Sequence, residues 1–209
     1  GKTYHRIQPF IEIMDCTLRD GEQTSGVSFL PHEKLQIARM LLRDVNVDRI
    51  EVASARVSEG EKDAVKMICR YANQIGMLGK VEVLGFVDGR LSIDWIDSCG
   101  GKVVNLLAKG SLKHCTHQLH KTVDEHIEEI RRSVGYAAGK GMDINLYLED
   151  WSNGMKDSPD HVYSMVDALR DTGIKRFMLP DTLGIMNPLQ AIEYFRKMLK
   201  RYPDLHFDF

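Results

Sequence analysis

The chain has 209 residues, of which 43% are hydrophobic and 28% are charged, a composition typical of a globular domain that buries a sizeable core. It excludes a disordered or collagen-like chain. With 28 Lys and Arg against 30 Asp and Glu, the formal net charge of −2 provides no basic field for nucleic acid or an anionic membrane surface. We therefore expect small-molecule partners. The short apolar runs fall far below the ~20 residues of a membrane span, and the first residues lack the apolar block of a signal peptide, so the expected location is cytoplasmic.

Short β-branched or apolar runs alternate with longer segments of helical period, which predicts βα units around a parallel sheet. Seven strands are expected, at residues 11–17, 49–54, 81–87, 103–108, 144–148, 176–179 and 206–209. Six helical segments lie between them.

Three helices have apolar stripes that we expect to face the sheet. The stripes comprise Leu35, Ala38, Leu41, Leu42 and Val45; Val123, Ile127, Ile130 and Val134; and Leu189, Ile192, Phe195 and Leu199. Helix starts are predicted at Pro31, after Thr122, at Ser158-Pro159 and at Asn187-Pro188, where a capping side chain or a first-turn proline fits.

The strand-plus-helix period of roughly 30 residues continues without a break in composition and favours one domain, a (β/α)8 barrel, over residues 1–209. A doubly wound open sheet is the alternative, but the sequence contains neither G-x-G-x-x-G nor G-x-x-x-x-G-K-[ST]. A barrel of this kind takes about 250 residues. We therefore expect the barrel to be truncated after about strand seven, with the rest of the barrel and any regulatory domain missing from these residues.

Polar residues follow several predicted strands, where a parallel barrel carries its reactive groups. Arg19 and Asp20 follow the first strand, Glu149 follows the fifth, and Thr182 follows the sixth. Arg19 and Asp20 could form a surface ion pair. At the mouth of a barrel, however, the carboxylate could bind a hard cation and the guanidinium could polarise an oxyanion.

Three histidines recur every three residues after the fourth strand, at His114, His117 and His120. This spacing could align metal ligands on a helix, but a polar helix surface explains His117 and His120 better. His114 is nearest the strand end and could reach the mouth of the barrel. Cys16 and Cys115 are expected to be packing residues. With Cys69 and Cys99 they form no C-x-x-C pair, so all four thiols are expected to be reduced.

The run Asp15-x-Thr17-Leu18-Arg19-Asp20-Gly21-Glu22-Gln23 resembles the signature of the acetyl-CoA-dependent Claisen condensation enzymes. These are the isopropylmalate, homocitrate and citramalate synthases, with the hydroxymethylglutaryl-CoA lyases as relatives. The similarity extends over nearly all of the chain and is strongest to the citramalate synthases. It includes Tyr147-Leu148-Glu149-Asp150-Trp151-Ser152-Asn153-Gly154 and Leu179-Pro180-Asp181-Thr182-Leu183-Gly184.

The resemblance implies a (β/α)8 barrel that uses acetyl-CoA as co-substrate and a divalent metal, Mn, Zn or Mg. Asp20 would be a metal ligand, and Arg19 would bind the keto acid and stabilise the developing alkoxide. Thr182 would hold the substrate carboxylate, and Glu149 would act as the general base or orient it.

The resemblance also implies two groups of binding residues. Leu84, Leu107 and Tyr147 would form the wall of the pocket for the side chain of the 2-keto acid. Gln23, Ser111 and His114 would lie near the acyl donor.

Because the three pocket residues are bulky, we expect pyruvate as the substrate and citramalate as the product, in isoleucine or leucine biosynthesis. 2-Isopropylmalate synthesis from 2-ketoisovalerate, a lyase reaction and a non-catalytic barrel fragment are the alternatives. The family's remaining metal ligands, an H-x-H after strand seven, would follow the final residues, since His206 is too early to serve. Members of this family are generally homodimers, so a homodimer is expected.

Overall fold

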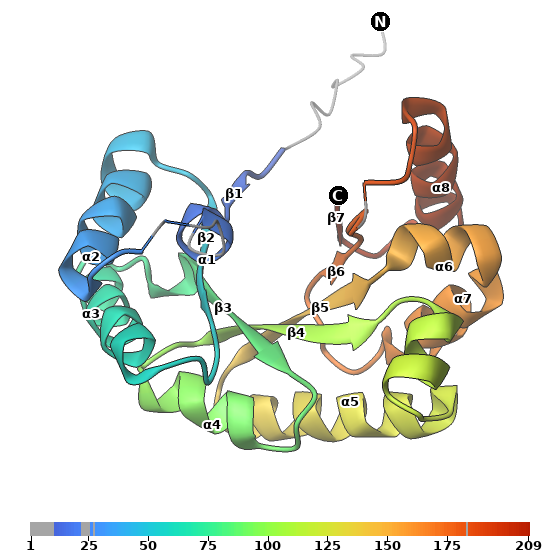
Figure 1. Ribbon diagram of the computed structural model, residues 1–209, viewed down its shortest axis with the longest axis horizontal. Helices are drawn as coiled ribbons and strands as arrows, with labels where there is room; N and C mark the ends of the chain where they lie inside the picture. Colours follow the sequence, from blue (N-terminus) through green and yellow to red (C-terminus); the bar gives the residue numbers. More distant parts are fainter. Residues whose placement is uncertain (1–10, 22–25, 27, 183) are drawn as a thin grey trace, which may run out of the picture.

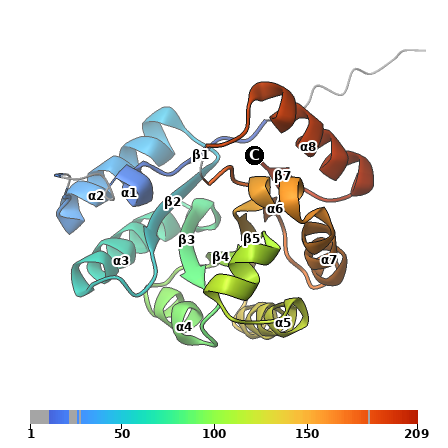
Figure 2. The same cartoon turned by 45° about the vertical axis from the view of Figure 1, so that its right-hand side comes forward.

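The computed structural model describes residues 11–21, 26, 28–182 and 184–209. Seven parallel strands form one sheet in the order β1-β2-β3-β4-β5-β6-β7. The sheet curves into a half-barrel with helices around its outer side (Figures 1 and 2). The strands are β1 (Met14–Asp15), β2 (Arg49–Ser54), β3 (Val81–Phe86), β4 (Val103–Lys109), β5 (Asp143–Glu149), β6 (Phe177–Met178) and β7 (Phe207–Asp208).

Helices occupy the connections between the strands. The α-helices are α1 (Thr17–Asp20), α2 (Pro31–Arg39), α3 (Glu59–Gln74), α4 (Leu91–Ser98), α5 (Val123–Gly139), α6 (Trp151–Asp157), α7 (Pro159–Leu169) and α8 (Pro188–Arg201). Two π-helical segments, η2 (Met40–Val45) and η4 (His114–Gln118), and a short 3₁₀ helix, η3 (Leu78–Lys80), complete the described elements.

The predicted fold class is confirmed, because these residues form seven consecutive parallel strands of a (β/α) barrel. Each strand pairs with its neighbours in the sequence, whereas a doubly wound sheet reverses its strand order at a switch point. The alternative fold is therefore wrong. All seven expected strands occur, although β1, β6 and β7 are each limited to two residues.

The helix starts follow the capping residues seen in the sequence. Thr122 and Asn187 accept hydrogen bonds from the backbone N–H groups of Glu125 and Gln190, and the side chains of these two residues bond back to the caps. Such reciprocal bonds satisfy donors that a helix leaves unpaired in its first turn. Pro31 and Pro159 occupy first-turn positions in α2 and α7, as expected.

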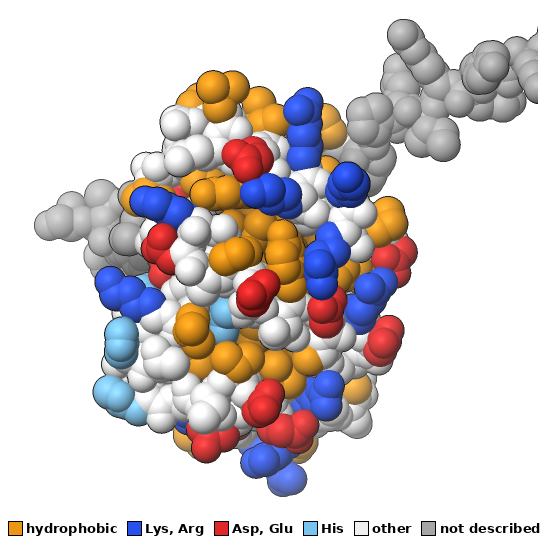
Figure 3. Space-filling view, turned by 90° about the vertical axis from the view of Figure 1, so that its right-hand side faces the viewer, with side chains coloured by type: hydrophobic (Ala, Val, Ile, Leu, Met, Phe, Trp, Pro, Cys, Tyr) orange, Lys and Arg blue, Asp and Glu red, His pale blue; other side chains and the backbone are white. Residues whose placement is uncertain are grey.

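One predicted helical stripe is wrong in large part. Leu189, Ile192 and Leu199 of α8 are exposed instead of facing the sheet, and Leu189 is 79% exposed. The helix packs through another side, where Phe195 stacks on the Trp151 ring with centroids 5.1 Å apart. Figure 3 shows hydrophobic side chains among the charged ones on the side of the molecule that carries α6, α7 and α8.

Val45, at the end of another predicted stripe, is also exposed. It lies in the π-helical segment η2, whose wider turn shifts the side chains away from the 3.6-residue period. Ile127, Ile130 and Val134 of α5 are buried as predicted.

The two faces of the sheet differ in chemistry. In β4 and β5, the residues that face the helices are apolar and buried, among them Leu106, Leu146 and Leu148. The alternate residues point to the concave side and are largely polar. None of the described helices is long and apolar enough to cross a membrane.

Candidate functional site

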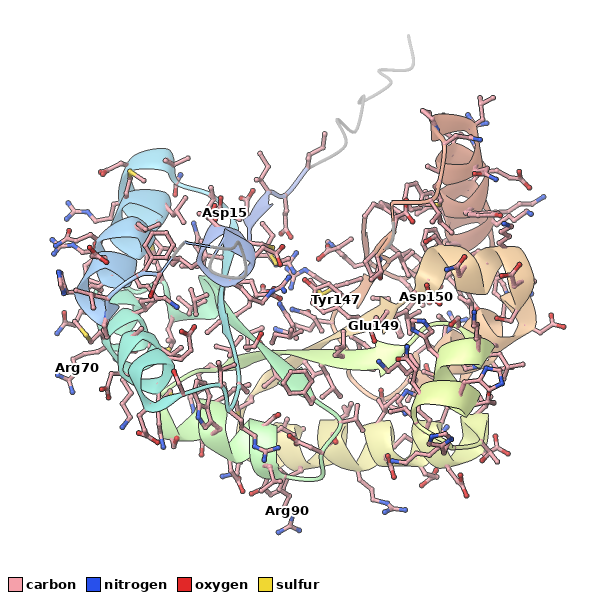
Figure 4. The ribbon with its side chains drawn as sticks, viewed as in Figure 1. Asp15, Arg70, Arg90, Tyr147, Glu149 and Asp150 are labelled. Atoms are coloured by element: carbon pink, nitrogen blue, oxygen red, sulfur yellow. The ribbon has the colours of Figure 1, made fainter. Side chains whose placement is uncertain are left out.

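The register between β4 and β5 arranges the inward-facing side chains in layers. Asn105 lies beside Asn145, Leu107 beside Tyr147, and Lys109 beside Glu149. The last pair is at the carboxyl ends of the strands, where a parallel barrel binds its substrates. Figure 4 shows Tyr147, Glu149 and Asp150 at this end of β5.

A chain of polar contacts runs through the inward-facing layers. Near the amino ends of the strands, Arg49 donates to both oxygens of Glu82 at 2.6 and 3.0 Å and lies 2.8 Å from Asp208 of β7. Asn145 connects Glu82 to Asn105, with contacts of 3.3 and 2.9 Å. The interior of the half-barrel is thus a connected polar network, because buried polar groups require partners.

Glu51 belongs to the same network, nearer the carboxyl ends of the strands, and is fully buried. It accepts hydrogen bonds from Asn105 Nδ2 at 2.6 Å and from the Tyr147 hydroxyl at 3.1 Å, and the Arg19 Nε–H donates to it. Arg19, the first of the predicted site residues, is therefore held against the sheet by a carboxylate of the neighbouring strand.

The charges of this pair depend on each other. Burial raises the pKa of the Glu51 carboxyl, and the attraction of Arg19 with the donors Asn105 and Tyr147 opposes that rise. Burial lowers the pKa of the Arg19 guanidinium, but Glu51 more than offsets this and leaves the pKa above its ordinary value. Since three donors converge on Glu51, we take the carboxylate as ionised at neutral pH.

Sequence reasoning did not single out Glu51, although it lies within the strand 49–54. Its signal was a lone carboxylate flanked by apolar residues in the run Ile50-Glu51-Val52-Ala53. Buried carboxylates are rare without a charged partner, so this position could have been recognised as one half of an ion pair.

Asp20 lies beside Arg19, with 2.8 Å between its Oδ1 and Arg19 Nη1, and its side chain is largely exposed. The turn that carries both is fixed by Asp15, which accepts hydrogen bonds from the backbone N–H and hydroxyl of Thr17. Within the described ranges, no three His, Cys, Asp or Glu side chains gather as metal ligands. Among the described residues, Asp20 is therefore not part of a complete metal site.

Glu149 contacts Lys109 through an ion pair between Oε2 and Nζ, and both side chains are partly buried. The backbone of Lys109 is held by two buried histidines. Its N–H donates to His126 Nε2 of α5 at 3.0 Å, and its carbonyl oxygen lies 2.9 Å from His161 Nε2 of α7. Burial lowers the pKa of both imidazoles, that of His126 to about 4, so both are neutral near pH 7.

Asp150, which the sequence did not single out, contacts three of the predicted site residues, Ser111, His114 and Thr182. The Asp150 carboxylate accepts a hydrogen bond from the Ser111 hydroxyl at 2.7 Å, and His114 Nε2 is 3.3 Å from the same oxygen. The backbone N–H of Asp150 donates to Thr182 Oγ1 at 3.0 Å. Three predicted site residues from two loops therefore share one buried carboxylate residue.

The remaining predicted residues have different placements. Leu84 is buried, and Leu107 and Tyr147 are partly buried on the concave side. Tyr147 also lines a cavity of about 570 Å³ between the two edges of the sheet, together with Cys16, Arg49, Met178 and Asp208. His117 and His120 are exposed, as expected for a polar surface, and Gln23 lies outside the described residues.

The HMGL-like family model matches residues 10–208, and the chain belongs to this family. The (R)-citramalate synthase CimA of Methanocaldococcus jannaschii is 33% identical over 189 residues, which cover 90% of this chain and 36% of that protein. A homocitrate synthase of Methanopyrus kandleri is 35% identical, with 92% and 46% covered, and a probable 2-isopropylmalate synthase of Ignicoccus hospitalis is 33% identical, with 90% and 45% covered. The chain thus spans less than half the length of these relatives.

Solved structures show the same fold. The HMG-CoA lyase of Bacillus subtilis superposes with a TM-score of 0.75 at 21% identity, covering 94% of this chain and 66% of that one. An HMG-CoA lyase of Acinetobacter baumannii, solved with coenzyme A and 3-methylmalate, gives 0.67 at 19% identity, with 94% and 65% covered. The curated relatives are synthases that act on small molecules, and their names differ in the product.

Proposed function

We propose that the chain carries the substrate-binding part of a synthase that condenses acetyl-CoA with a 2-keto acid. The observation that carries this proposal is the Arg19 guanidinium, which the buried Glu51 holds at the carboxyl end of the sheet. Condensation builds negative charge on the keto oxygen, and a fixed cation stabilises such charge without reorganising during the reaction.

The proposed reaction transfers one proton and forms one carbon–carbon bond. A base removes a proton from the methyl group of acetyl-CoA, the resulting enolate carbon bonds to the keto carbon, and the keto oxygen becomes an alkoxide that is then protonated. Hydrolysis of the thioester releases CoA thiol. Glu149 is our candidate to accept the methyl proton or to orient its acceptor, and Arg19 would face the alkoxide.

Thr182 is the proposed contact for the substrate carboxylate. Its Oγ1 accepts the backbone N–H of Asp150, so its own hydroxyl hydrogen remains available to donate to an anion. Asp20 is the proposed protein ligand for a divalent metal. The described residues provide only this part of such a site.

The test is an assay for release of CoA thiol from acetyl-CoA, with pyruvate or 2-ketoisovalerate as acceptor. The full-length protein is used. We expect thiol release with a 2-keto acid and at least tenfold loss in Arg19→Lys, since Lys cannot reproduce the guanidinium geometry. No thiol release from acetyl-CoA, together with cleavage of a hydroxyacyl-CoA, would identify a lyase. Inactivity in both assays would leave a non-catalytic barrel.

Pyruvate is the acceptor that we favour, because Leu84, Leu107 and Tyr147 would crowd a branched side chain. Leu107→Ala should raise kcat/KM for 2-ketoisovalerate relative to pyruvate by about 10-fold or more, within the range that one or two methylenes provide. Leu106→Ala is the matched control, because Leu106 is buried on the helix-facing side of the same strand. An unchanged ratio in Leu107→Ala would refute the pocket assignment.

A further inference from the structure

We propose that Asp150 is a positioning residue that sets the binding of the acyl donor through Ser111 and His114. This inference rests on the proposed condensation function and adds a residue to it. The juxtaposition that carries it is a carboxylate, only 2% exposed, at the point where the loops after β4, β5 and β6 meet.

The Asp150 side chain is shared between the β4 and β5 loops. Its Oδ2 accepts a hydrogen bond from the Ser111 hydroxyl at 2.7 Å and lies 3.3 Å from His114 Nε2. Its Oδ1 accepts a hydrogen bond from Asn153 Nδ2 of α6 at 2.8 Å. The Ser111 hydroxyl also accepts the backbone N–H of His114 at 3.2 Å. The carboxylate therefore fixes both the start of η4 and the ring that η4 carries.

These contacts leave His114 with one defined orientation. His114 Nε2 lies 3.3 Å from the carboxylate, so we assign the ring proton to this nitrogen, and Nδ1 is enclosed without a hydrogen-bond partner among the described residues. The imidazole keeps 20% of its side chain exposed. In the proposed reaction, the acyl donor would contact the ring at this exposed edge. Removing the charge of Asp150 should release the ring without removing it.

The backbone of Asp150 has a separate role. Its φ of +64° is left-handed, a conformation that Asp and Asn adopt more readily than most residues. In this conformation its N–H reaches Thr182 Oγ1. Asp150→Asn is thus suited to the test, because it preserves the size of the side chain, the tolerance of positive φ and the bond to Thr182.

We expect Asp150→Asn to raise the KM for acetyl-CoA about tenfold or more while the KM for the keto acid stays within about twofold. His114→Gln should raise the acetyl-CoA KM similarly, and the double variant should be no worse than the more affected single variant, because both act through the same ring. Ser111→Ala should raise it less, since the carboxylate still faces His114.

Asp181→Asn is the matched control. Asp181 also ties a loop of the same edge, accepting the Ser152 hydroxyl at 2.6 Å and the N–H groups of Ile185 and Met186, but the structure gives it no contact with Ser111 or His114. It should leave the acetyl-CoA KM within about twofold. Equal changes in both KM values of Asp150→Asn, or additive effects in the double variant, would overturn the proposal.

An NMR measurement separates this inference from the proposed function. The imidazole ¹⁵N shifts of His114 should report a proton held on Nε2 in the unmodified protein, and a changed tautomer mixture in Asp150→Asn. Identical spectra would overturn the positioning role even if the enzyme condenses acetyl-CoA. The tautomer of His114 could change as predicted in a protein that releases no CoA thiol. That result would support the contact between Asp150 and His114 and would refute the condensation function.

Discussion

At the scale of single residues, the site depends on carboxylates that the sequence motif does not include. The signature supplies Arg19 and Asp20, but Glu51 from β2 holds the guanidinium and Asp150 from the β5 loop holds Ser111 and His114. A charge that is fixed before the substrate arrives costs little reorganisation during the reaction. The supporting carboxylates are therefore as important to the geometry as the residues that would touch substrate.

Glu51→Gln should destabilise the protein and impair its activity together. The substitution leaves the partly buried Arg19 without its buried counter-charge, so we expect a loss of about 3 kcal/mol in the free energy of unfolding. Urea denaturation measures this loss. The same change in Glu193, which pairs with Lys197 on the surface of α8 at 2.7 Å, should cost less than about 0.5 kcal/mol. Similar losses in both variants would contradict the assignment of Glu51.

At the scale of elements, the carboxyl end of β4 is held by helices on the far side of the sheet. His126 of α5 and His161 of α7 bond the N–H and carbonyl of Lys109, and the side chain of Lys109 contacts Glu149 on the concave side. Two neutral imidazoles therefore fix the backbone at the end of this strand. This connects the helix layer to the candidate site.

The burial of His126 predicts that the protein loses stability in mild acid. The pKa of His126 falls from 6.5 in the unfolded chain to about 4 in the folded protein because of burial. Above pH 6.5 both states are neutral and the stabilising contact is fully present. Between pH 6.5 and 4 the unfolded chain binds a proton that the folded protein does not, so the free energy of unfolding should fall by about 3 kcal/mol.

Urea denaturation at several pH values between 7 and 4 measures this dependence. His126→Gln, whose side-chain oxygen can accept the Lys109 N–H, should flatten it. The exposed His117 provides the control, since His117→Gln should leave the pH dependence intact. A pH dependence that is unchanged in His126→Gln would show that other groups cause it.

Secondary structure was largely predictable because local signals specify it. Proline and capping residues set the starts of α2, α5, α7 and α8, and the strand runs were recognisable by their apolar residues. The α8 stripe was wrong because periodicity identifies an apolar side of a helix but not what covers it. The π-helical turn at Met40–Val45 was not foreseen either, since no local residue signalled it.

Site residues were predictable to the extent that each follows a strand. Arg19, Glu149 and Thr182 follow from that rule, whereas the convergence of Ser111, His114 and Thr182 on Asp150 depends on how three loops pack together. Contacts between residues 32 to 39 positions apart leave no local pattern in the sequence. The same limit hid the pairing of Arg19 with Glu51.

At the scale of the whole molecule, the two edges of the sheet are connected through the interior. Arg49 of β2 contacts Asp208 of β7 at 2.8 Å, and Glu12, which precedes β1, lies 3.3 Å from Arg176, which precedes β6. These ion pairs cross the space between the first and last strands. We therefore expect them to stabilise the curved form of the half-barrel.

Arg49→Met should therefore be among the most destabilising single changes. It leaves Glu82 buried and without its charged partner, and it removes the contact to Asp208, so we expect a loss of about 4 kcal/mol in the free energy of unfolding. Arg43→Met, at an exposed position of η2, should change it by less than about 0.5 kcal/mol. Thermal and urea denaturation compare the two variants. Equal stability would refute the role of the interior network.

The order of the strands also has a consequence for how the chain folds. Because every strand pairs with the strand before it in the sequence, each βα unit can dock as soon as it has been synthesised, against a unit already in place. These pairings join residues 21 to 40 positions apart, and closing loops of that length costs less entropy than pairing distant strands. The ion pairs between the two edges are the exception, since they join residues 159 and 164 positions apart and can form only after the intervening units are complete. The pairing of Arg49 with Asp208 would therefore be a late event in the folding of these residues.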